Sequence, residues 1–291
     1  MAAPLLPEPA IAVQGLFYAY GGRIALNGVT FGVYPESIHG FVGPNGAGKT
    51  TCLKVLATLL RTRPGAVKLF GKDIVRERNA VRTRLGFMPD TPSMYRQMTV
   101  FEYLDFFGAA YGQSAAQRDQ VIKDVLELTD MTGRGEDLIK SLSRGMQQRI
   151  SLARCLVHDP DLLLLDEPAA GLDPRARIEL MEILKELRRM GKTIFISSHI
   201  LAELATLCDS VTIIDQGVIK YSGTMDDLLA REGHTSTYVL TLAAEDPATA
   251  DALLETPGID DVVKLEDKPA YEITFRSAHR ASAEHRRQQS D

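Results

Sequence analysis

Nine consecutive residues have the types and spacing of a phosphate-binding loop: Gly43, Pro44, Asn45, Gly46, Ala47, Gly48, Lys49, Thr50 and Thr51. They fit a pattern of glycine, four variable residues, and then glycine, lysine and a hydroxyl residue. The glycines let successive backbone N–H groups turn toward an anion, and a helix N-terminus behind them adds positive dipole. In such a loop Lys49 reaches the β- and γ-phosphates, and the Thr50 hydroxyl binds Mg²⁺. The pattern predicts a site for a nucleoside triphosphate.

The sequence before this loop has the pattern of a strand, and the sequence after it has the pattern of a helix. Residues 37–42 are short and apolar enough for a buried strand, and residues 52–60 carry apolar side chains at helical spacing. A strand, a glycine loop and a helix in this order are the context that supports the motif. The alternative is an ordinary glycine turn before a lysine. A chance match has odds on the order of one in a hundred, and the flanking elements lower them further.

Two carboxylates follow an intensely apolar run. Residues 162–165 are consecutive leucines, which is typical of a central parallel strand buried on both faces, and Asp166 and Glu167 come next. Open α/β sheets bind ligands at the carboxyl ends of their strands. Asp166 can therefore belong to the Mg²⁺ site, and Glu167 can accept a proton from an attacking water. The alternative is a strand end whose acidic side chains only contact solvent.

A histidine and a tyrosine are further candidates. Residues 193–199 form another apolar strand pattern that ends at His199, and this histidine can contact a γ-phosphate if the strand follows the carboxylate strand in the sheet. Tyr20 precedes a glycine pair, where its ring can project from a turn and stack on a base. On the residues alone, a structural role for His199 and simple packing of Tyr20 stay open.

Ser143 and Gly145 lie at the start of a helical pattern that continues to residue 157. Serine caps a helix N-terminus, and the open N–H groups there attract negative charge. This start is therefore a candidate for a second anion site. The alternative is that the serine only caps the helix.

The order of the elements predicts an α/β fold. Strand patterns precede the phosphate loop, and they alternate with helices after it. Between residues 99 and 158 the pattern is helical throughout, which indicates a helical subdomain inserted into an α/β sheet protein. Residues 11–234 form the predicted nucleotide-binding domain, and residues 235–275 form a small α+β appendage. We expect residues 1–10 and 276–291 to be disordered tails.

Composition limits the classes of function. The chain has 291 residues, of which 45% are hydrophobic and 24% charged, as in ordinary globular proteins. The net charge of −5 gives no global basic field for nucleic acid, so no nucleic-acid partner is expected. No apolar run approaches the ~20 residues that a membrane-spanning helix needs. Cys52, Cys155 and Cys208 show no metal or disulfide spacing, which favours a reducing cytoplasm.

Together these motifs resemble the nucleotide-binding subunits of ABC transporters over about residues 11–231. Residues 43–50 resemble the Walker A motif, residues 162–167 resemble Walker B with its catalytic glutamate, and residues 142–146 resemble the signature motif. The remaining matches are the D-loop at residues 170–173 with Asp173, the switch histidine at His199 and the adenine-stacking aromatic at Tyr20. The resemblance implies a P-loop NTPase (RecA-like) core with an antiparallel β region. It also implies hydrolysis of ATP with Mg²⁺, with Lys49, Glu167 and His199 as catalytic residues.

The chain departs from the family pattern at four positions, which are Asp90, Arg144, Met146 and Ala170. Asp90 stands where the Q-loop usually has glutamine or, in some export branches, glutamate. We expect it to act as an acidic acceptor that faces the metal, although it could merely cap the turn after Pro89. Residues 142–149 and the α+β tail resemble the ABC-2 export branch, whose ATPase is a separate polypeptide from its membrane partner.

The resemblance further implies a two-chain machine. Each chain would bind one ATP through its own Walker motifs and would offer Ser143 and Gly145 to the ATP of its partner in a head-to-tail homodimer. The other expected partner is a separate transmembrane permease, contacted by the helical insert and the Asp90 loop. Such a subunit sits at the cytoplasmic face of a bacterial membrane.

Two other readings compete with transport. One is an ABC ATPase that acts on ribosomes or DNA, but translation factors of that type carry two phosphate loops, and chromosome-type ATPases contain long heptad runs that are absent from this sequence. The other is a nucleotide-binding regulator without turnover, which the presence of Lys49, Asp166, Glu167 and His199 disfavours. A GTPase is disfavoured because no Asn-Lys-x-Asp motif occurs.

Overall fold

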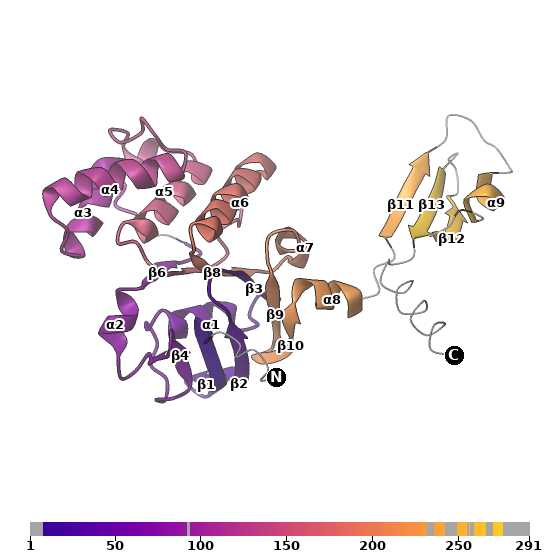
Figure 1. Cartoon of the computed structure of the whole chain (residues 1–291), viewed down its shortest axis with the longest axis horizontal. Helices are drawn as coiled ribbons and strands as arrows, with labels where there is room; N and C mark the ends of the chain where they lie inside the picture. The colour runs from indigo at the N-terminus through magenta and orange to yellow at the C-terminus, as the bar shows by residue number, and fades with distance from the viewer. Residues whose placement is uncertain are drawn as a thin grey trace, which may run out of the picture. The chain divides into compact units, whose positions relative to one another are not determined.

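The computed structural model describes residues 8–91, 94–231, 236–241, 249–254, 256, 259–265 and 270–275. The chain divides into two compact units, residues 1–223 and 224–291 (Figure 1). The sequence analysis places the end of the ATPase domain at residue 234, whereas the contacts assign the last helix before that residue to the second unit. Among the described residues, no helix combines the length and the apolar character that crossing a membrane requires.

A six-stranded sheet with the order β10-β9-β3-β8-β7-β6 forms the centre of the first unit. Its strands are β3 (Ile38–Val42), β6 (Leu85–Met88), β7 (Leu162–Leu165), β8 (Thr193–Ser198), β9 (Ser210–Asp215) and β10 (Val218–Thr224). Strands β6, β7, β8, β3 and β9 pair in parallel, and every residue of β3, β7 and β8 is buried. Burial on both faces explains their continuous apolar runs. Because the strands are parallel, their carboxyl ends share one edge.

A second sheet has the order β2-β1-β4-β5 and is antiparallel. Its strands are β1 (Ile11–Tyr20), β2 (Arg23–Val33), β4 (Val67–Leu69) and β5 (Lys72–Asp73). Helix α1 (Lys49–Leu56) shares one buried apolar cluster with both sheets and lies between them (Figure 1). In the sequence only residues 29–33 carry a strand pattern here, but β2 begins at Arg23. Irregular register between β1 and β2 breaks the simple alternation there and explains the difference.

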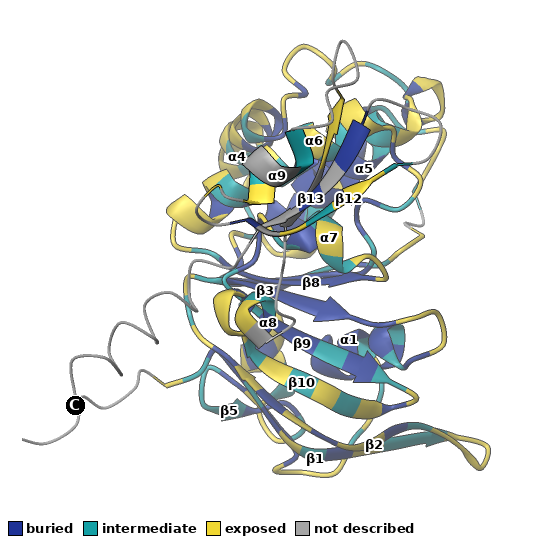
Figure 2. Cartoon of the chain, turned by 90° about the vertical axis from the view of Figure 1, so that its right-hand side faces the viewer, coloured by how far each residue is buried: buried dark blue, intermediate teal, exposed yellow. Residues whose placement is uncertain are grey.

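A helical subdomain stands on the β6 side of the sheet (Figure 1). Its elements are α3 (Val100–Ala110), α4 (Ala115–Leu128), the short 3₁₀ helix η1 (Ile139–Ser141) and α5 (Arg144–Leu156). Thr99 with Glu102, and Ser114 with Gln117, form capping boxes that fix the starts of α3 and α4. Figure 2 shows that the outer faces of these helices are exposed, whereas the strands below them are buried. The local caps explain why these two helices begin where the sequence predicts.

Three other helices complete the first unit, namely α2 (Arg78–Arg82), α6 (Pro174–Arg189) and α7 (Leu201–Leu204). The five residues of α2 are too few to give a periodic signal in the sequence. Residues 200–207 carry a helical pattern, whereas α7 ends at Leu204. Asp173 caps α6 by accepting a hydrogen bond from the N–H of Ala176 at 2.9 Å.

The second unit contains a three-stranded antiparallel sheet with the order β11-β13-β12. Its elements are α8 (Met225–Arg231), β11 (Ser236–Thr241), α9 (Thr249–Leu254), β12 (Ile259–Lys264) and β13 (Ala270–Phe275). Ile259, Tyr271 and Ile273 form its small core. Within the predicted appendage at residues 235–275, the described residues form these three strands and α9. Of the predicted tails at residues 1–10 and 276–291, residues 1–7 and 276–291 lie outside the described residues.

Candidate active site

The phosphate loop connects β3 to α1, and two of its glycines are required by the fold. A Cβ atom on Gly43 would lie 2.1 Å from the carbonyl oxygen of Ile214 in β9. Gly48 has a φ of 108°, and a Cβ there would lie 2.6 Å from the carbonyl oxygen of Ala25 in β2. Strands β2 and β9 therefore press against the loop from behind and fix its backbone.

Lys49 is held at the base of the loop, and its side chain is only 6% exposed. Its Nζ donates hydrogen bonds to the carbonyl oxygens of Gly43 at 2.6 Å and Pro44 at 3.2 Å. The same Nζ lies 3.2 Å from Oε1 of Glu167. A buried ammonium group needs such partners because its desolvation is costly. The loop thus positions one positive charge beside the first residues of α1.

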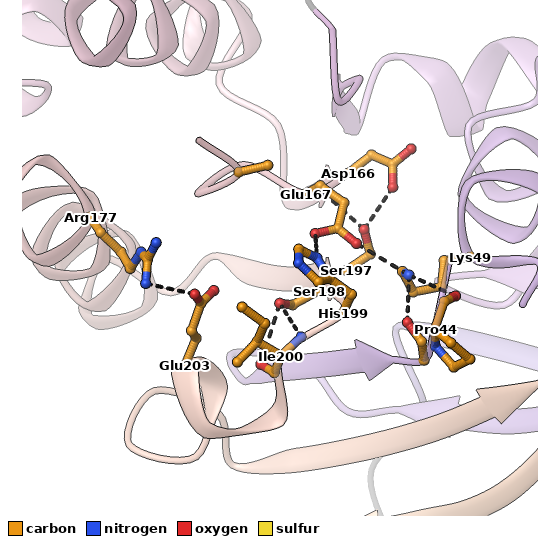
Figure 3. Close-up of polar contacts among 12 residues, drawn as sticks. Pro44, Lys49, Asp166, Glu167, Arg177, Ser197, Ser198, His199, Ile200 and Glu203 are labelled. Carbon is orange, nitrogen blue, oxygen red and sulfur yellow. Dashed lines mark hydrogen bonds and ion pairs between the residues drawn. The ribbon is translucent and has the colours of Figure 1, made fainter. Parts of the chain in front are cut away.

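Glu167 lies between Lys49 and His199 (Figure 3). Its Oε2 is 2.9 Å from Nδ1 of His199, which directly follows β8, the strand that neighbours β7. Glu167 has a φ of 47°, in the left-handed region that non-glycine residues rarely adopt. Its N–H donates to Oγ of Ser197 at 2.9 Å, which helps to hold this backbone. The geometry directs the carboxylate toward the phosphate loop.

Asp166 is 1% exposed and shares Ser197 with its neighbour. Oγ of Ser197 donates to Oδ1 of Asp166 at 2.6 Å, whereas the buried Oδ2 has no hydrogen-bond partner among the described residues. Burial raises the pKa of Asp166, hydrogen bonds from Ser197 and Thr50 oppose that rise, and the charges of Asp90 and Glu167 add to it. A buried carboxylate oxygen without a donor is a fit place for a cation.

A pocket of about 550 Å³ opens in front of these groups. The predicted residues that line it are Tyr20, Asn45, Gly46, Gly48, Lys49, Thr50, Thr51, Asp90 and Glu167. Gly43, Pro44 and Ala47 form the loop behind it, and His199 reaches the site through Glu167. Tyr20 is 48% exposed. Its ring forms a T-shaped pair with the ring of Tyr18, with 4.9 Å between the two centroids. Its free surface leaves room for a stacked base.

Asp90 follows β6 and is exposed at this pocket. Its Oδ1 accepts a hydrogen bond from the N–H of Thr91 at 2.6 Å. Its charge is close enough to raise the pKa of Asp166, after the larger contribution of burial. Asp90 therefore contacts the turn that follows it, which is the alternative that the sequence left open. It also lies near Asp166, which directly follows β7.

The other predicted site residues do not line the pocket of their own chain. Ser143 is the exposed N-cap of α5 and accepts a hydrogen bond from the N–H of Met146 at 3.3 Å. Gly145 lies in the first turn of α5, and Asp173 caps α6. Arg144 donates from Nη2 to the carbonyl oxygen of Ala170 at 3.1 Å. These residues thus form a separate group around the starts of α5 and α6.

Sequence reasoning missed several residues of the site. Ser197 makes hydrogen bonds to both Asp166 and Glu167. Its position near the end of an apolar strand is the one feature of the sequence that could have indicated this role. Arg23, Ile24 and Ala25 in β2, and Gln216 with Gly217 after β9, line the pocket from other elements. Neither segment carries a nucleotide-binding motif. The sheet order brings them to the loop.

A glycine loop between β3 and α1, with the buried Asp166 and the partly buried Glu167 directly after β7, defines the class of P-loop NTPases. The structure confirms the predicted fold class, including the antiparallel β region and the inserted helices.

Comparison with known proteins identifies the family. The family described as ABC transporter matches residues 26–170. The daunorubicin resistance ATP-binding protein DrrA3 of Streptomyces coeruleorubidus is 35% identical, over 87% of this chain and 80% of that protein. The Nod factor export ATP-binding protein I of Paraburkholderia xenovorans is 37% identical, over 78% of this chain and 75% of that protein. The chain belongs to the ATP-binding subunits of ABC transporters.

A solved structure of an ATP-binding subunit of an ABC transporter agrees with this family. It is 31% identical, with a TM-score of 0.69 over 77% of this chain and 93% of that chain. Members of the family bind ATP and hydrolyse it, and this chain is an ATPase of that kind.

Proposed function

We propose that this chain hydrolyses Mg²⁺-bound ATP in the pocket in front of the phosphate loop and thereby powers a separate membrane-spanning export subunit. One observation carries the proposal: Glu167 lies between Lys49 at 3.2 Å and His199 at 2.9 Å, at the end of a buried strand. This arrangement places a carboxylate, a cation and an imidazole together where the loop would hold the γ-phosphate.

Glu167 is the proposed general base. It takes a proton from water while the water oxygen bonds to the γ-phosphorus, and the bond from that phosphorus to the bridging oxygen of ADP breaks. Lys49 stabilises negative charge on the phosphates. The loop carbonyls of Gly43 and Pro44 hold its Nζ in place, beside the carboxylate of Glu167. His199 holds the second carboxylate oxygen and orients the base.

The residues present fit Mg²⁺, which binds oxygen ligands and commonly takes one or two carboxylates together with substrate phosphates. Asp166 offers a buried Oδ2 without a hydrogen-bond donor among the described residues, and the nearby Thr50 hydroxyl opposes the rise in the pKa of this carboxylate. Thr50 and Asp166 would hold the ion, with Asp90 at the edge of the same pocket. When bound, Mg²⁺ neutralises charge on the phosphate oxygens. Tyr20 would stack on the adenine.

The second anion site supports a sandwich of two chains. Ser143 and Gly145 lie at the start of α5, whose N-terminus attracts negative charge, and neither lines the pocket of its own chain. Asp173 caps the adjacent α6. In the proposed dimer, these residues face the ATP that the other chain holds. Hydrolysis then removes the bridging γ-phosphate and releases the two chains.

An aromatic groove is the proposed contact for the permease. It has a volume of about 340 Å³ and lies between the core and the helical subdomain, with Leu59, Phe107, Tyr111, Arg154 and His158 among its lining residues. The rings of Tyr111 and His158 stack at 3.9 Å, and Leu59 is 57% exposed. The named relatives are ATP-binding subunits, and one is named for export. A cytoplasmic segment of an export permease is therefore the proposed occupant.

Copurification from membranes tests this function. The full chain, tagged and expressed in its native host, should capture a multi-span membrane protein, and Tyr111→Asp should reduce that capture by about tenfold because it places a charge in the groove. Tyr34→Asp is a matched control, since Tyr34 is 45% exposed and Tyr111 is 47% exposed. ATP binding should be unchanged in both variants. Equal capture by both variants, or no captured membrane protein, would contradict the coupling to a permease.

A further inference from the structure

An ion pair joins the helix after the D-loop to the segment after His199. Nη1 of Arg177 lies 2.7 Å from Oε1 of Glu203, and the two side chains are 36% and 14% exposed. Arg177 is in the first turns of α6, and Glu203 is in α7. Among the described residues, this is the ion pair that connects these two helices. Residues far apart in sequence are thus fixed to one another.

The pair lies beside the proposed catalytic groups. A small cavity of about 110 Å³ is lined by Arg177 and Glu203 and also by Glu167 and His199. Figure 3 shows the ion pair on one side of the His199 segment and Lys49 on the other. The same cavity is lined by residues 167–171 and by residues 196–200. Side-chain packing therefore does not fill all of the space between these two segments. A polar link at its edge therefore matters for their spacing.

His199 itself needs such support. Its side chain is 44% exposed, so packing alone does not restrict its position. Ser198 stabilises the next turn, since its Oγ accepts from the N–H of Ile200 at 3.0 Å. Glu203 follows four residues after His199 and attaches the same segment to α6. Two contacts thus hold the backbone on the far side of the imidazole.

The chemistry of the pair suits a rigid link. An arginine stays charged in proteins and presents a planar, fixed set of donors. Glu203 is mostly buried, so removal of Arg177 would leave a carboxylate without its cation, and the α7 segment would move toward solvent to relieve that cost. Movement of α7 shifts His199 with it, since Ile200 alone separates His199 from the helix.

We propose that Arg177 and Glu203 are positioning residues that keep His199 in contact with Glu167 during ATP hydrolysis. The inference rests on the proposed roles of Glu167 and His199. Neither Arg177 nor Glu203 lines the nucleotide pocket, so the pair acts on turnover and leaves the binding of ATP unchanged.

Steady-state kinetics on the full chain test this. Glu203→Gln keeps the shape but removes the charge, and Arg177→Met removes the charge at similar length. Both should lower kcat about 10- to 100-fold, as expected for a small displacement of a catalytic group. The dissociation constant of a non-hydrolysable ATP analogue should change less than about twofold. Arg177→Lys, which keeps the charge, should recover part of the turnover.

Arg188→Met is the matched control. Arg188 lies on the same helix and pairs with Asp209 at the same distance, 2.7 Å, but it lines neither pocket of the site. This variant should keep wild-type turnover. If it lowers kcat as much as Arg177→Met does, the loss comes from a weakened helix and the inference fails. Should Arg177→Met not fold, judged by its melting curve, Glu203→Gln decides alone.

A double-mutant comparison separates positioning from general stability. In a His199→Ala background, Glu203→Gln should cost no further turnover, because it acts through the imidazole that is already missing. A full additional loss would overturn the inference. Glu167→Gln and His199→Ala, measured in parallel, report on the proposed site itself. If those two retain wild-type turnover, the site assignment fails; if they lower turnover while Glu203→Gln in the wild-type background is normal, only the positioning role fails.

Discussion

Two helix starts in this protein have the geometry to bind an anion, and they differ in how much of the site their own chain supplies. Helix α1 begins at Lys49, inside a pocket of about 550 Å³, with its Nζ in contact with Glu167. Helix α5 begins after Ser143, which is exposed and does not line that pocket. The first site has walls, a cation and a carboxylate that is the proposed base, whereas the second offers a helix N-terminus and a hydroxyl.

The two helix starts also differ in the contacts that hold them, and this difference indicates which site one chain can complete by itself. At α1, strands β2 and β9 press on the glycines and fix the loop. At α5, Arg144 of the first turn donates a hydrogen bond to the carbonyl oxygen of Ala170. The α1 site can hold a nucleotide alone, while the α5 site becomes useful in the proposed dimer only when another chain brings the nucleotide.

Glu167→Gln should have the largest effect, because it removes the base from the complete site and leaves its shape. Turnover should fall about 10²- to 10⁴-fold, while ATP still binds and the proposed closed dimer accumulates. Steady-state ATPase assays and light scattering with Mg²⁺ and ATP check both parts. A variant that stays monomeric under these conditions would contradict the sandwich, and normal turnover would contradict the assignment of the base.

Lys49→Ala removes the buried cation of the same site. Turnover should fall about 10²- to 10³-fold, and the affinity for ATP should fall with it, because the phosphates lose their opposing charge. Fluorescent-nucleotide titration and ATPase assays measure the two effects. Unchanged hydrolysis would mean that the phosphate loop does not bind the reacting nucleotide.

Ser143→Arg probes the incomplete site. A bulky cation at the α5 start should block dimer closure and lower turnover about tenfold, the value of one hydrogen bond to a charged group. ATP binding by the isolated chain should remain within about twofold, because Ser143 does not line its own pocket. Loss of ATP affinity in the monomer would break the comparison between the two helix starts.

Asp90→Ala should have the smallest effect. The loss of one exposed charge near Mg²⁺ is expected to cost about 1 kcal/mol, or about fivefold in the Mg²⁺ midpoint. Asp90→Glu should be milder, since it keeps the charge. A titration of ATPase activity with Mg²⁺ measures the midpoint. An unshifted midpoint with unchanged turnover would leave Asp90 with the turn contact to Thr91 alone.

Local sequence determined the phosphate loop, the carboxylate strand and the main helix starts. Glycine is the residue that the backbone of Gly43 and Gly48 needs, and capping by Thr99 and Ser114 is a contact within one turn of helix. The four leucines of β7 report burial on both faces. Such features depend on neighbours in sequence, so they can be read without the fold.

Only the tertiary structure decided how these parts meet. The order β9-β3-β8-β7 brings Ser197 and His199 to Asp166 and Glu167, across some thirty residues of intervening chain. It also turns the carboxylate of Glu167 toward Lys49 and seats Arg177 on Glu203. No local propensity encodes the order of strands in a parallel sheet, because that order follows from burying all of the apolar faces at once.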